Sequence, residues 1–317
     1  MKIGLDVMGG DFAPQATIAG AIAASRELPS EDKIVLIGKE EMILSELSTQ
    51  GADPNSFIIA NAPDVIEMGE SPTKAFIQKP HSSIALGFHL LKHNEIQAFA
   101  SAGNTGAMVV GSIYSINTIQ GVIRPCSSVI VPQEKGGVSI LIDVGTNPDP
   151  KPDVLYQFGL LGSIYAESIY GIDKPRVALL NIGEEEEKGN LLCQAAFGLM
   201  KDSKDFNFIG NMEGRDLMKS KADVIVCDGF TGNVLLKTME AVYRMLVKRG
   251  LADEFINRMN YENYGGTPLL GVNAPVILGH GISKEVAFKN IILLSKHAFE
   301  AKLTEKIHEA LLKYELE

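Results

Sequence analysis

The sequence has few cysteines, an excess of negative charge and no long apolar run, and each shortage excludes a class of protein. Its three cysteines, Cys126, Cys193 and Cys227, are far apart and lack metal-ligand spacing, which favours reduced thiols in the cytosol. The formal net charge of -10 means that nucleic acid or anionic lipid could bind only at a local basic patch. Apolar runs stop well before membrane-spanning length, and Met1-Lys2 leads directly into a strand-like run. We therefore expect a cytoplasmic chain without a transmembrane helix, a secretory signal or a nucleic-acid partner.

Common catalytic signatures are missing too. No Ser-His-Asp order, nucleophile elbow or G-x-G-x-x-G motif can be placed. His89 and His93 are four residues apart, but the intervening Leu-Leu-Lys and the lack of a carboxylate ligand favour surface histidines. The sequence gives no sign of a metal or cofactor, and it indicates chemistry without a covalent enzyme intermediate.

Short β-type runs alternate with runs of helical period along the whole chain. With 45% hydrophobic residues, the 317 residues can bury a large core, in one α/β unit over 1–317 or in two interleaved lobes. The pattern predicts strands near 2–7, 33–38, 57–60, 96–101, 126–132, 138–144, 175–181, 206–210 and 223–227. It predicts helices near 14–27, 39–50, 81–94, 105–119, 153–170, 189–202, 213–220, 231–249 and 283–314. This alternation favours a mostly parallel sheet with helices on both faces.

Two segments depart from the alternation. Lys135-Gly136-Gly137 separates two β-type runs and predicts a β-hairpin, which adds an antiparallel pair. Residues 261–282 contain Gly and Pro without clear periodicity, so we expect a long loop that is functional or covers a site.

Four small polar loops follow predicted strands: 8–11, 101–106, 145–147 and 228–233. A small-residue loop that opens a helix leaves N–H groups unpaired, and open α/β sheets bind ligands at the carboxyl ends of their strands. Together the loops predict one polar pocket for an oxyanion such as phosphate. The phosphate-binding candidates are Gly103, Asn104, Thr105, Gly106 and Thr231, and the other pocket candidates are Asp6, Gly9, Gly10, Asp11, Asn147, Asn181 and Asn190. Plain helix caps and strand-to-helix turns are the alternative interpretation, and a residue can both cap and bind.

Four further residues are candidates for chemistry: Lys188, Asp228, Asn233 and His280. Lys188 is a lone cation beside Gly189-Asn190, after an acidic run (184–187) that we interpret as solvated or as favouring the next helix N-terminus. His280 lies between two glycines that expose its ring, although a turn histidine would look the same.

Residues 238–259 combine apolar positions at helical spacing with interleaved basic residues. The apolar set includes Val242, Met245, Leu246, Leu251 and Phe255, and the basic set is Arg244, Lys248, Arg249 and Arg258. A helical hairpin over about 231–260 could pack on its own core or on a dimer partner, or it could form a basic amphipathic tip on membrane headgroups. The two combine if paired helices form a dimer and leave an apolar tip exposed.

Taken together, these loops resemble the bacterial phosphate acyltransferase family, and the likeness runs nearly from end to end. The matching motifs are D-V-M-G-G-D-F-A-P at 6–14, A-S-A-G-N-T-G-A at 100–107, I-D-V-G-T-N at 142–147, N-I-G-E-E-E-E-K-G-N at 181–190, G-N-M-E-G-R-D at 210–216, D-V-I-V-C-D-G-F-T-G-N-V at 223–234, Y-G-G-T-P-L-L-G-V at 264–272 and H-G at 280–281. The resemblance implies an isopropylmalate-dehydrogenase-like α/β fold related to phosphotransacetylases, and a homodimer.

The resemblance also implies transfer of a long fatty acyl group from an acyl-carrier-protein thioester to inorganic phosphate. The acyl phosphate product would pass to a membrane glycerol-3-phosphate acyltransferase, with peripheral contact at the inner face of the cell membrane. On this interpretation Asn104, Thr105 and the following helix hold phosphate, Lys188 offsets its charge, and Thr231 and Asn233 add hydrogen bonds. Asp228 would orient Lys188 or His280, and an oxyanion donor would come from the His280 ring or from a glycine N–H.

Three rival interpretations remain at this stage. A phosphotransacetylase would use coenzyme A and short acyl groups. A dehydrogenase of the same fold should show clustered acidic metal ligands and an arginine set, whereas Arg124, Arg176 and Arg215 are scattered. A scaffold without catalytic activity would bind carrier protein or membrane through 238–259.

Overall fold

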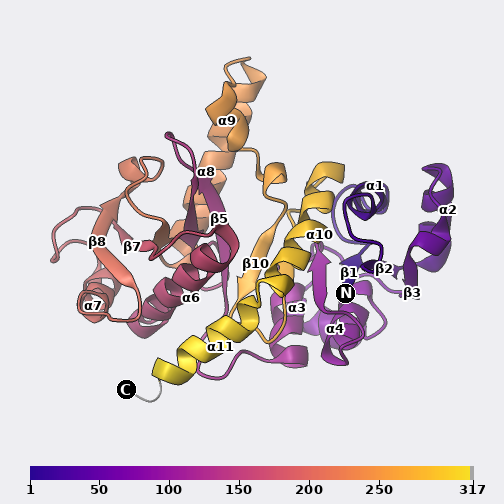
Figure 1. The fold of residues 1–317 in the computed structure, drawn as a ribbon, viewed down its shortest axis with the longest axis horizontal. Helices are drawn as coiled ribbons and strands as arrows, with labels where there is room; N and C mark the ends of the chain where they lie inside the picture. The colour runs from indigo at the N-terminus through magenta and orange to yellow at the C-terminus, as the bar shows by residue number, and fades with distance from the viewer. Residues whose placement is uncertain (315–317) are drawn as a thin grey trace. The chain divides into compact units, whose positions relative to one another are not determined.

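The structure is a computed structural model that describes residues 1–314, and the chain divides into two compact units (Figure 1). Unit 1 contains Met1–Thr118 and Tyr261–Glu300, and unit 2 contains Ile119–Asn260 and the residues from Ala301 onward. Each unit is built from two separate stretches of the sequence, so the chain enters each unit twice.

Unit 1 contains six strands in the order β3-β2-β1-β4-β11-β10. They are β1 (Lys2–Asp6), β2 (Lys33–Gly38), β3 (Ile58–Asn61), β4 (Ala98–Ser101), β10 (Thr267–Leu270) and β11 (Val276–Leu278). All neighbouring pairs are parallel except β10 and β11, which are antiparallel. The mostly parallel sheet predicted from the sequence is thus confirmed in this unit.

Helices cover both faces of the unit 1 sheet. They are α1 (Gln15–Ser25), α2 (Glu40–Thr49), α3 (Pro72–Gln78), α4 (Ser83–Lys92), α5 (Thr105–Gly111) and α10 (Glu285–Glu300), with short 3-10 turns at Pro54–Ser56 and Tyr261–Asn263. Successive residues of β2 point to opposite faces, so Ile34 and Leu36 join one buried cluster and Val35 and Ile37 the other. Because both faces are buried, the strands read as continuous apolar runs.

Unit 2 contains five strands in the order β5-β6-β9-β7-β8. They are β5 (Cys126–Pro132), β6 (Val138–Ile142), β7 (Arg176–Asn181), β8 (Asn207–Glu213) and β9 (Val224–Val226). The pair β5–β6 is antiparallel and the remaining pairs are parallel. Gly136 and Gly137 take φ values of 93° and 79° in the turn between β5 and β6, which confirms the predicted hairpin.

The helices of unit 2 are α6 (Pro152–Tyr170), α7 (Leu191–Met200), α8 (Gly229–Lys248), α9 (Glu254–Arg258) and α11 (Leu303–Tyr314), with a 3-10 turn at Gly214–Asp216. The long helix α6 is the most deeply buried of them, because its apolar residues and two glycines pack closely on the sheet. A Cβ at Gly162, for example, would lie 2.5 Å from Val224 Cγ1. Helix α8 packs through Leu235, Leu236 and Met239 against a buried cluster that includes Leu141 of β6 and Ile225 of β9.

Several predicted boundaries are wrong. Residues 261–282 are not a plain loop, because they contain β10 and β11, whose three or four residues are too few to show a period. The predicted helix over 213–220 is only the 3-10 turn, since Ser220 adopts a left-handed φ of 56°. The helix over 283–314 divides into α10 and α11 at Lys302, whose φ is 52°. The predicted helix over 105–119 is α-helical only as far as Gly111, and a π-helix follows directly at Ser112–Ile116.

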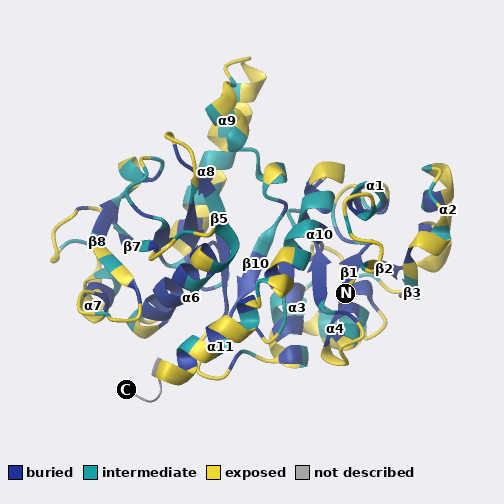
Figure 2. Ribbon diagram, viewed as in Figure 1, coloured by how far each residue is buried: buried dark blue, intermediate teal, exposed yellow. Residues whose placement is uncertain are grey.

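The α8–α9 segment carries the apolar residues of the predicted tip. Only Gly229 and Gly232 of α8 are buried, and both lie in its first turn. Val242, Met245 and Leu251 are exposed, so the outer part of α8 and its continuation present apolar surface (Figure 2). Arg258 of α9 donates to Gln133 O over 3.0 Å and also to Gly137 O, which fastens α9 to the β5–β6 hairpin. Among the residues described, no helix has the length and apolar character needed to cross a membrane.

Candidate functional site

In unit 1, Asp6 braces the two loops that follow β1 and β4. Its carboxylate is buried and accepts hydrogen bonds from Ser101 Oγ over 2.6 Å and from Met8 N over 3.0 Å. Ser101 Oγ in turn accepts from Gly103 N over 2.9 Å. Burial raises the pKa of Asp6, while the hydrogen bond from Ser101 opposes that rise. Asp6 therefore holds the 8–11 and 101–103 loops in one fixed arrangement.

The glycines of these loops are packed against neighbouring backbone. A Cβ at Gly9 would lie 2.6 Å from Gly103 N, and Gly10 has a φ of 105°. Asp11 N donates to Gly281 O over 2.7 Å, which joins the 8–11 loop to the 279–281 loop. Unit 1 thus brings together three of the predicted loop regions, around Gly9–Asp11, Gly103–Asn104 and His280.

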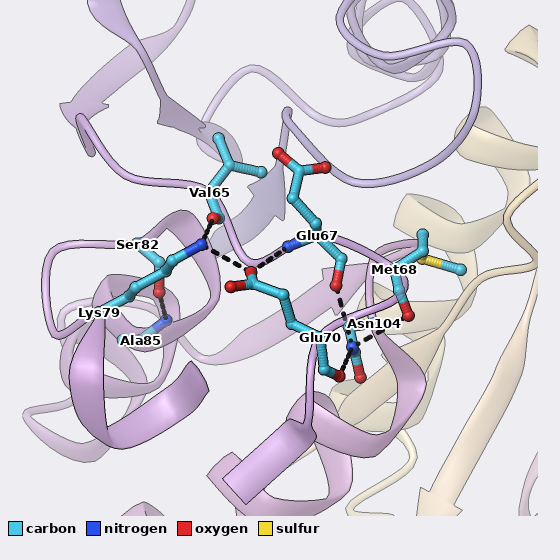
Figure 3. Close-up of polar contacts among 8 residues, drawn as sticks. All are labelled: Val65, Glu67, Met68, Glu70, Lys79, Ser82, Ala85 and Asn104. Carbon is cyan, nitrogen blue, oxygen red and sulfur yellow. Dashed lines mark hydrogen bonds and ion pairs between the residues drawn. The ribbon is translucent and has the colours of Figure 1, made fainter. Parts of the chain in front are cut away.

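Asn104 caps helix α5 and also fastens a segment that lies far from it in the sequence. Its Oδ1 accepts from Ala107 N over 3.0 Å. Its Nδ2 donates to the carbonyl oxygens of Glu67, Met68 and Glu70 over 3.1, 3.3 and 3.1 Å (Figure 3). All these contacts are internal, so an anion at this helix would be met by the N–H groups of Thr105 and Gly106 in the first turn. The predicted cap at Asn104 is confirmed, and phosphate binding there stays a prediction.

The tautomer of His280 follows from its backbone contact. Nδ1 accepts a hydrogen bond from Ile282 N over 3.3 Å, so a neutral His280 ring carries its proton on Nε2. The ring is half-buried and packs against Tyr261 with a centroid separation of 5.3 Å. The His280 side chain is therefore held in one orientation with a donor at Nε2.

In unit 2, Asp143 organises the loop that follows β6. Its buried Oδ1 accepts from Ser127 N, Ser127 Oγ and Val144 N over 3.0, 2.8 and 2.7 Å. Its Oδ2 accepts from Asn147 N over 2.6 Å and from Asn147 Nδ2 over 3.0 Å. Asn147 Nδ2 also donates to Pro125 O over 2.8 Å, so both residues shape the loop. Sequence reasoning did not select Asp143, although the quoted motif I-D-V-G-T-N contains it.

Asn181 and Asn190 shape the loop that carries Lys188. Asn181 Nδ2 donates to Lys188 O over 3.1 Å, and Asn190 Oδ1 accepts from Cys193 N over 2.9 Å as the N-cap of α7. Within residues 1–314, Lys188 forms no ion pair, while the neighbouring Glu184 and Glu186 pair with Lys221 and Lys201. The ammonium of Lys188 is thus available to an anion at the carboxyl end of β7.

Asp228 is the N-cap of helix α8. It accepts from Thr231 N over 2.8 Å and from Thr231 Oγ1 over 2.7 Å, so Thr231 lies within the first turn and does not itself cap the helix. Asn233, two residues further along, is exposed, and its Oδ1 lies 3.5 Å from where a Cβ at Gly145 would be. No salt bridge joins Asp228 to Lys188 in the described part of the chain.

Helices α7 and α8 follow the neighbouring parallel strands β7 and β9, so their first turns lie at the same edge of the unit 2 sheet. Burial and then the charge of Asp228 raise the pKa of the Cys193 thiol in the first turn of α7. A Cβ at Gly189 would lie 2.8 Å from Cys193 Cβ, and a Cβ at Gly232 would lie 1.9 Å from Asp143 O. Unit 2 therefore gathers the predicted residues Asn147, Asn181, Lys188, Asn190, Asp228, Thr231 and Asn233 at the carboxyl ends of β6, β7 and β9. Among the residues the structure describes, no group of three or more His, Cys, Asp or Glu side chains is placed to hold a metal ion.

The sequence matches a known family over nearly its whole length. A family profile described as "Fatty acid synthesis protein" matches residues 1–306. A phosphate acyltransferase from Syntrophomonas wolfei is 42% identical over 310 residues, which cover 96% of this chain and 97% of that protein. A phosphate acyltransferase from Dictyoglomus thermophilum is 42% identical over 332 residues, which cover 99% of this chain and 98% of the relative.

Solved structures share the fold at much lower sequence identity. A phosphotransacetylase from Streptococcus pyogenes superposes with a TM-score of 0.64 at 18% identity, covering 95% of this chain and 94% of that chain. A 4-hydroxythreonine-4-phosphate dehydrogenase from Klebsiella pneumoniae superposes with a TM-score of 0.58 at 14% identity, covering 94% of this chain and 98% of that chain. These likenesses confirm the expected α/β fold, which the phosphotransacetylase shares.

Proposed function

We propose, from the premise that this chain belongs to the phosphate acyltransferase family, that it transfers a long-chain fatty acyl group from acyl-acyl-carrier protein to inorganic phosphate. Family membership makes the protein an acyltransferase of fatty acid and phospholipid synthesis. The carrier-bound donor and the steps below are our proposal. The structural observation that carries it is the setting of Lys188, an ammonium without an acidic partner in the described chain, in the loop between β7 and α7 at the sheet edge where α8 also begins.

Phosphate binding needs positive charge and hydrogen-bond donors. In unit 2, Lys188 would offset the charge of the dianion, while the exposed Asn233 amide of α8 would add a donor. Thr231 Oγ1, which donates to Asp228 in this structure, would add a second donor by turning from that carboxylate to the phosphate. In unit 1, the N–H groups of Thr105 and Gly106 offer a second set of donors, with Gly103 and Asn104 fixing the start of the helix. Asp228, whose carboxylate holds Thr231, would act by positioning that turn.

The chemical step requires no group beyond a positioned phosphate and a donor for the oxyanion. A phosphate oxygen attacks the thioester carbonyl carbon, the carbon–sulfur bond breaks, and the proton of hydrogen phosphate passes to the departing carrier thiolate. The carbonyl oxygen becomes negative on the way, and a preorganised donor stabilises it. His280 Nε2–H is our candidate for that donor, because the contact from Ile282 N fixes its tautomer. No cofactor is needed by this scheme.

The polar residues outside the reacting set would hold the loops. Asp6, Asn147 and Asn181 are buried and bonded to loop backbone, and Asn190 caps α7. Gly9 and Gly10 let the backbone of the 8–11 loop approach its neighbours, and Asp11 ties it to Gly281. We propose that these residues act through geometry and not through contact with the reacting atoms.

The α8–α9 segment would serve assembly and the membrane. Its exposed apolar residues, with Leu246 and Phe255 half-buried beside them, fit a homodimer contact that leaves an apolar tip for peripheral contact with lipid. Such a location at the inner face of the membrane would let acyl phosphate pass to a membrane glycerol-3-phosphate acyltransferase. A Val242→Glu, Leu251→Glu double variant should lose binding to anionic vesicles while keeping turnover of carrier-bound substrate in solution.

An acidic enzyme needs a local basic surface to bind an acidic carrier protein. Arg215, Lys219 and Lys221 are already paired with Glu213, Asp216 and Glu184, whereas Lys248 and Arg249 at the end of α8 form no ion pair within the described residues. Charge reversal at Lys248 and Arg249 should therefore raise KM for the carrier substrate in a salt-dependent way. The same reversal at Arg215 and Lys219 should have the smaller effect.

Comparison of acyl donors tests the proposed reaction directly. Purified protein is incubated with phosphate and palmitoyl-carrier protein, palmitoyl-coenzyme A or acetyl-coenzyme A, and acyl phosphate is trapped with hydroxylamine. Hydroxamate that requires phosphate and forms best from the carrier-bound donor supports the proposal. Hydroxamate from acetyl-coenzyme A instead would assign the chain a phosphotransacetylase activity. A folded protein that forms none from any donor would favour a scaffold.

A further inference from the structure

The segment 65–70 of unit 1 has no assigned role, yet it is held more firmly than an ordinary surface loop. Asn104 Nδ2 meets three of its carbonyl oxygens at 3.1 to 3.3 Å. From the other side, Lys79 Nζ donates to Val65 O over 2.8 Å and to Glu70 Oε2 over 2.6 Å. Glu70 Oε2 also accepts from Glu67 N over 2.8 Å, so the two ends of the segment are tied together.

Figure 3 shows how these contacts divide the segment into two sides. The carbonyl groups of Glu67, Met68 and Glu70 turn toward the Asn104 amide, and the side chains of Glu67 and Met68 point away from it. Asn104 itself is buried, and Pro72 covers Gly106, where a Cβ would lie 2.4 Å from Pro72 Cγ. The carbonyl groups that anchor the segment thus lie on its inner side, and the Glu67 and Met68 side chains lie on its outer side.

Met68 is the apolar group that this arrangement presents. Its side chain is 52% exposed, and its Cε lies 3.3 Å from where a Cβ at Gly281 would be. That position is also 3.6 Å from Asp11 Oδ1, so Met68 borders the joined 8–11 and 279–281 loops. Phe12, 45% exposed, follows Asp11, and the ammonium of Lys284 lies 5.7 Å from its ring centroid.

A phosphate pocket gains nothing from a thioether at its edge, because apolar surface offers the dianion neither charge nor hydrogen-bond donors. A fatty acyl thioester does gain, since burial of methylene groups is favourable and methionine adapts to flexible apolar partners. The segment has a hydrogen-bonded backbone and a buried Ile66, while Met68 is left exposed, and this arrangement suits contact with an apolar ligand.

We propose that residues 65–70 form a positioning loop whose Met68 side chain contacts the acyl group of the thioester, and that Asn104 and Lys79 hold this loop. The inference rests on the proposed acyl transfer, and it gives Asn104 a role different from that of a phosphate ligand. Asn104 and Lys79 are positioning residues, because both act through the loop backbone.

Two variants and one control test the loop. Met68→Ala removes the contact, Lys79→Met removes one anchor, and Ile77→Ala is the control, because Ile77 is an exposed apolar residue on neighbouring α3. Both test variants should raise KM for palmitoyl-carrier protein, about tenfold for Met68→Ala, while KM for phosphate changes less than about twofold. Lys79→Arg should restore the wild-type value, because arginine can donate to both acceptors.

Coupling between the two positions gives a readout that a purely structural role would not produce. The double variant should be less impaired than the sum of the single variants, since an unanchored loop no longer presents position 68. Hydrogen exchange at the amides of 67–70 should accelerate in Lys79→Met and not in Met68→Ala. If Lys79→Met does not fold, Glu70→Gln can be used in its place, because it removes the same ion pair.

Each alternative outcome decides against a different part of the proposal. Unchanged KM for the acyl donor in both variants, matching Ile77→Ala, would overturn the loop's role and leave the proposed reaction intact. A rise in KM for phosphate instead would assign the loop and Asn104 to the phosphate site. A wild-type protein that forms no acyl phosphate would overturn the proposed reaction, and the acyl contact with it.

Discussion

The strand ends of the two units hold their loops in the same way and differ in which polar side chains remain for a ligand. In unit 1 the polar side chains that follow strands are occupied by neighbours, as Asp6 is by Ser101 and Met8, and Asn104 is by four backbone groups. In unit 2 the corresponding carboxylate and amides also hold loops, but Asn233 is exposed, and the half-buried Lys188 forms no ion pair within the described residues. Polar residues after strands therefore brace loops in both regions, and unit 2 adds Lys188 and Asn233 as ligand candidates.

The difference assigns separate tasks to the two regions. Unit 1 offers the oriented His280 ring and the apolar Met68, which suit a thioester, in addition to the α5 N–H groups proposed as the second set of donors for phosphate. Unit 2 offers an ammonium and two helix first turns, a set suited to a dianion. Perturbing one residue of each kind tests whether this division holds.

Removal of the Lys188 ammonium should have the largest effect. For Lys188→Ala we expect kcat/KM for phosphate to fall on the order of 100- to 1000-fold, the usual loss when one preorganised electrostatic group is deleted. Lys201→Ala, which removes another lysine of unit 2 that pairs with Glu186, is the matched control. Initial rates of acyl phosphate formation at varied phosphate measure both. An unchanged rate would remove Lys188 from the phosphate site.

Asp143 should be the strongest structural residue of the unit 2 site. Asp143→Asn places an amide against N–H donors of Asn147 and removes a buried charge that several donors solvate, so we expect a loss of about 3 kcal/mol in the free energy of unfolding. Urea unfolding followed by circular dichroism measures the loss. Asp149→Asn, an exposed substitution in the same loop, should change stability little. Equal stability of the two variants would contradict the bracing role.

The cap at Asp228 should contribute less. Asp228→Ala removes the acceptor for Thr231 and should cost about 1 kcal/mol of stability, whereas Asp228→Ser keeps a cap and should cost little. If Asp228 only positions the first turn of α8, Asp228→Ser also keeps most of kcat. A stable Asp228→Ser protein with a large loss of kcat would show that the carboxylate takes part in chemistry.

The smallest expected effect is a shift in pH dependence at Asp6. Burial raises its pKa in the folded state, so the folded protein binds more protons than the unfolded chain between the two pKa values. The free energy of unfolding should therefore fall as the pH rises through that window. Ser101→Ala removes a hydrogen bond that lowers this pKa, so the fall should extend to higher pH. Ser112→Ala, a buried serine bonded to Met108 O, should leave the pH profile unchanged.

Sequence periodicity was sufficient for the long, buried elements. Strands such as β1 and β7 and the long helix α6 have enough residues to show their period, and their predicted positions agree with the structure to within a few residues. The short strands β10 and β11 could not be predicted, because their pairing is decided by β4, which lies far away in the sequence. Helix α3 was missed for a similar reason, as its seven residues show too little of a period.

The candidate site could be predicted at the level of loops and not of side-chain roles. The small residues around Asn104 and Asp228 mark helix starts in the sequence, and both residues are N-caps in the structure. The contacts of Asn104 with Glu67, Met68 and Glu70 span more than thirty residues, so no local sequence pattern could predict them. Likewise, six donors converge on Asp143, from residues 127, 144, 146 and 147, and only the folded chain brings Ser127 to the local ones.

The interrupted path of the chain through unit 1 sets an order of events during synthesis. Strands β1 to β4 leave the ribosome first, but β11 and the α10 residues Phe288, Ile291 and Ile292 that complete their core come after residue 260. At 5 to 20 residues per second, the intervening residues 119–260 take roughly 7 to 30 s to translate. During that interval the edge of β4 lacks β11, and one face of the sheet lacks α10. The exposed strand edge would suit a chaperone that binds apolar strands. Residues 119–260 of unit 2 can begin to fold in that interval, but α11 completes unit 2 only after α10 has completed unit 1.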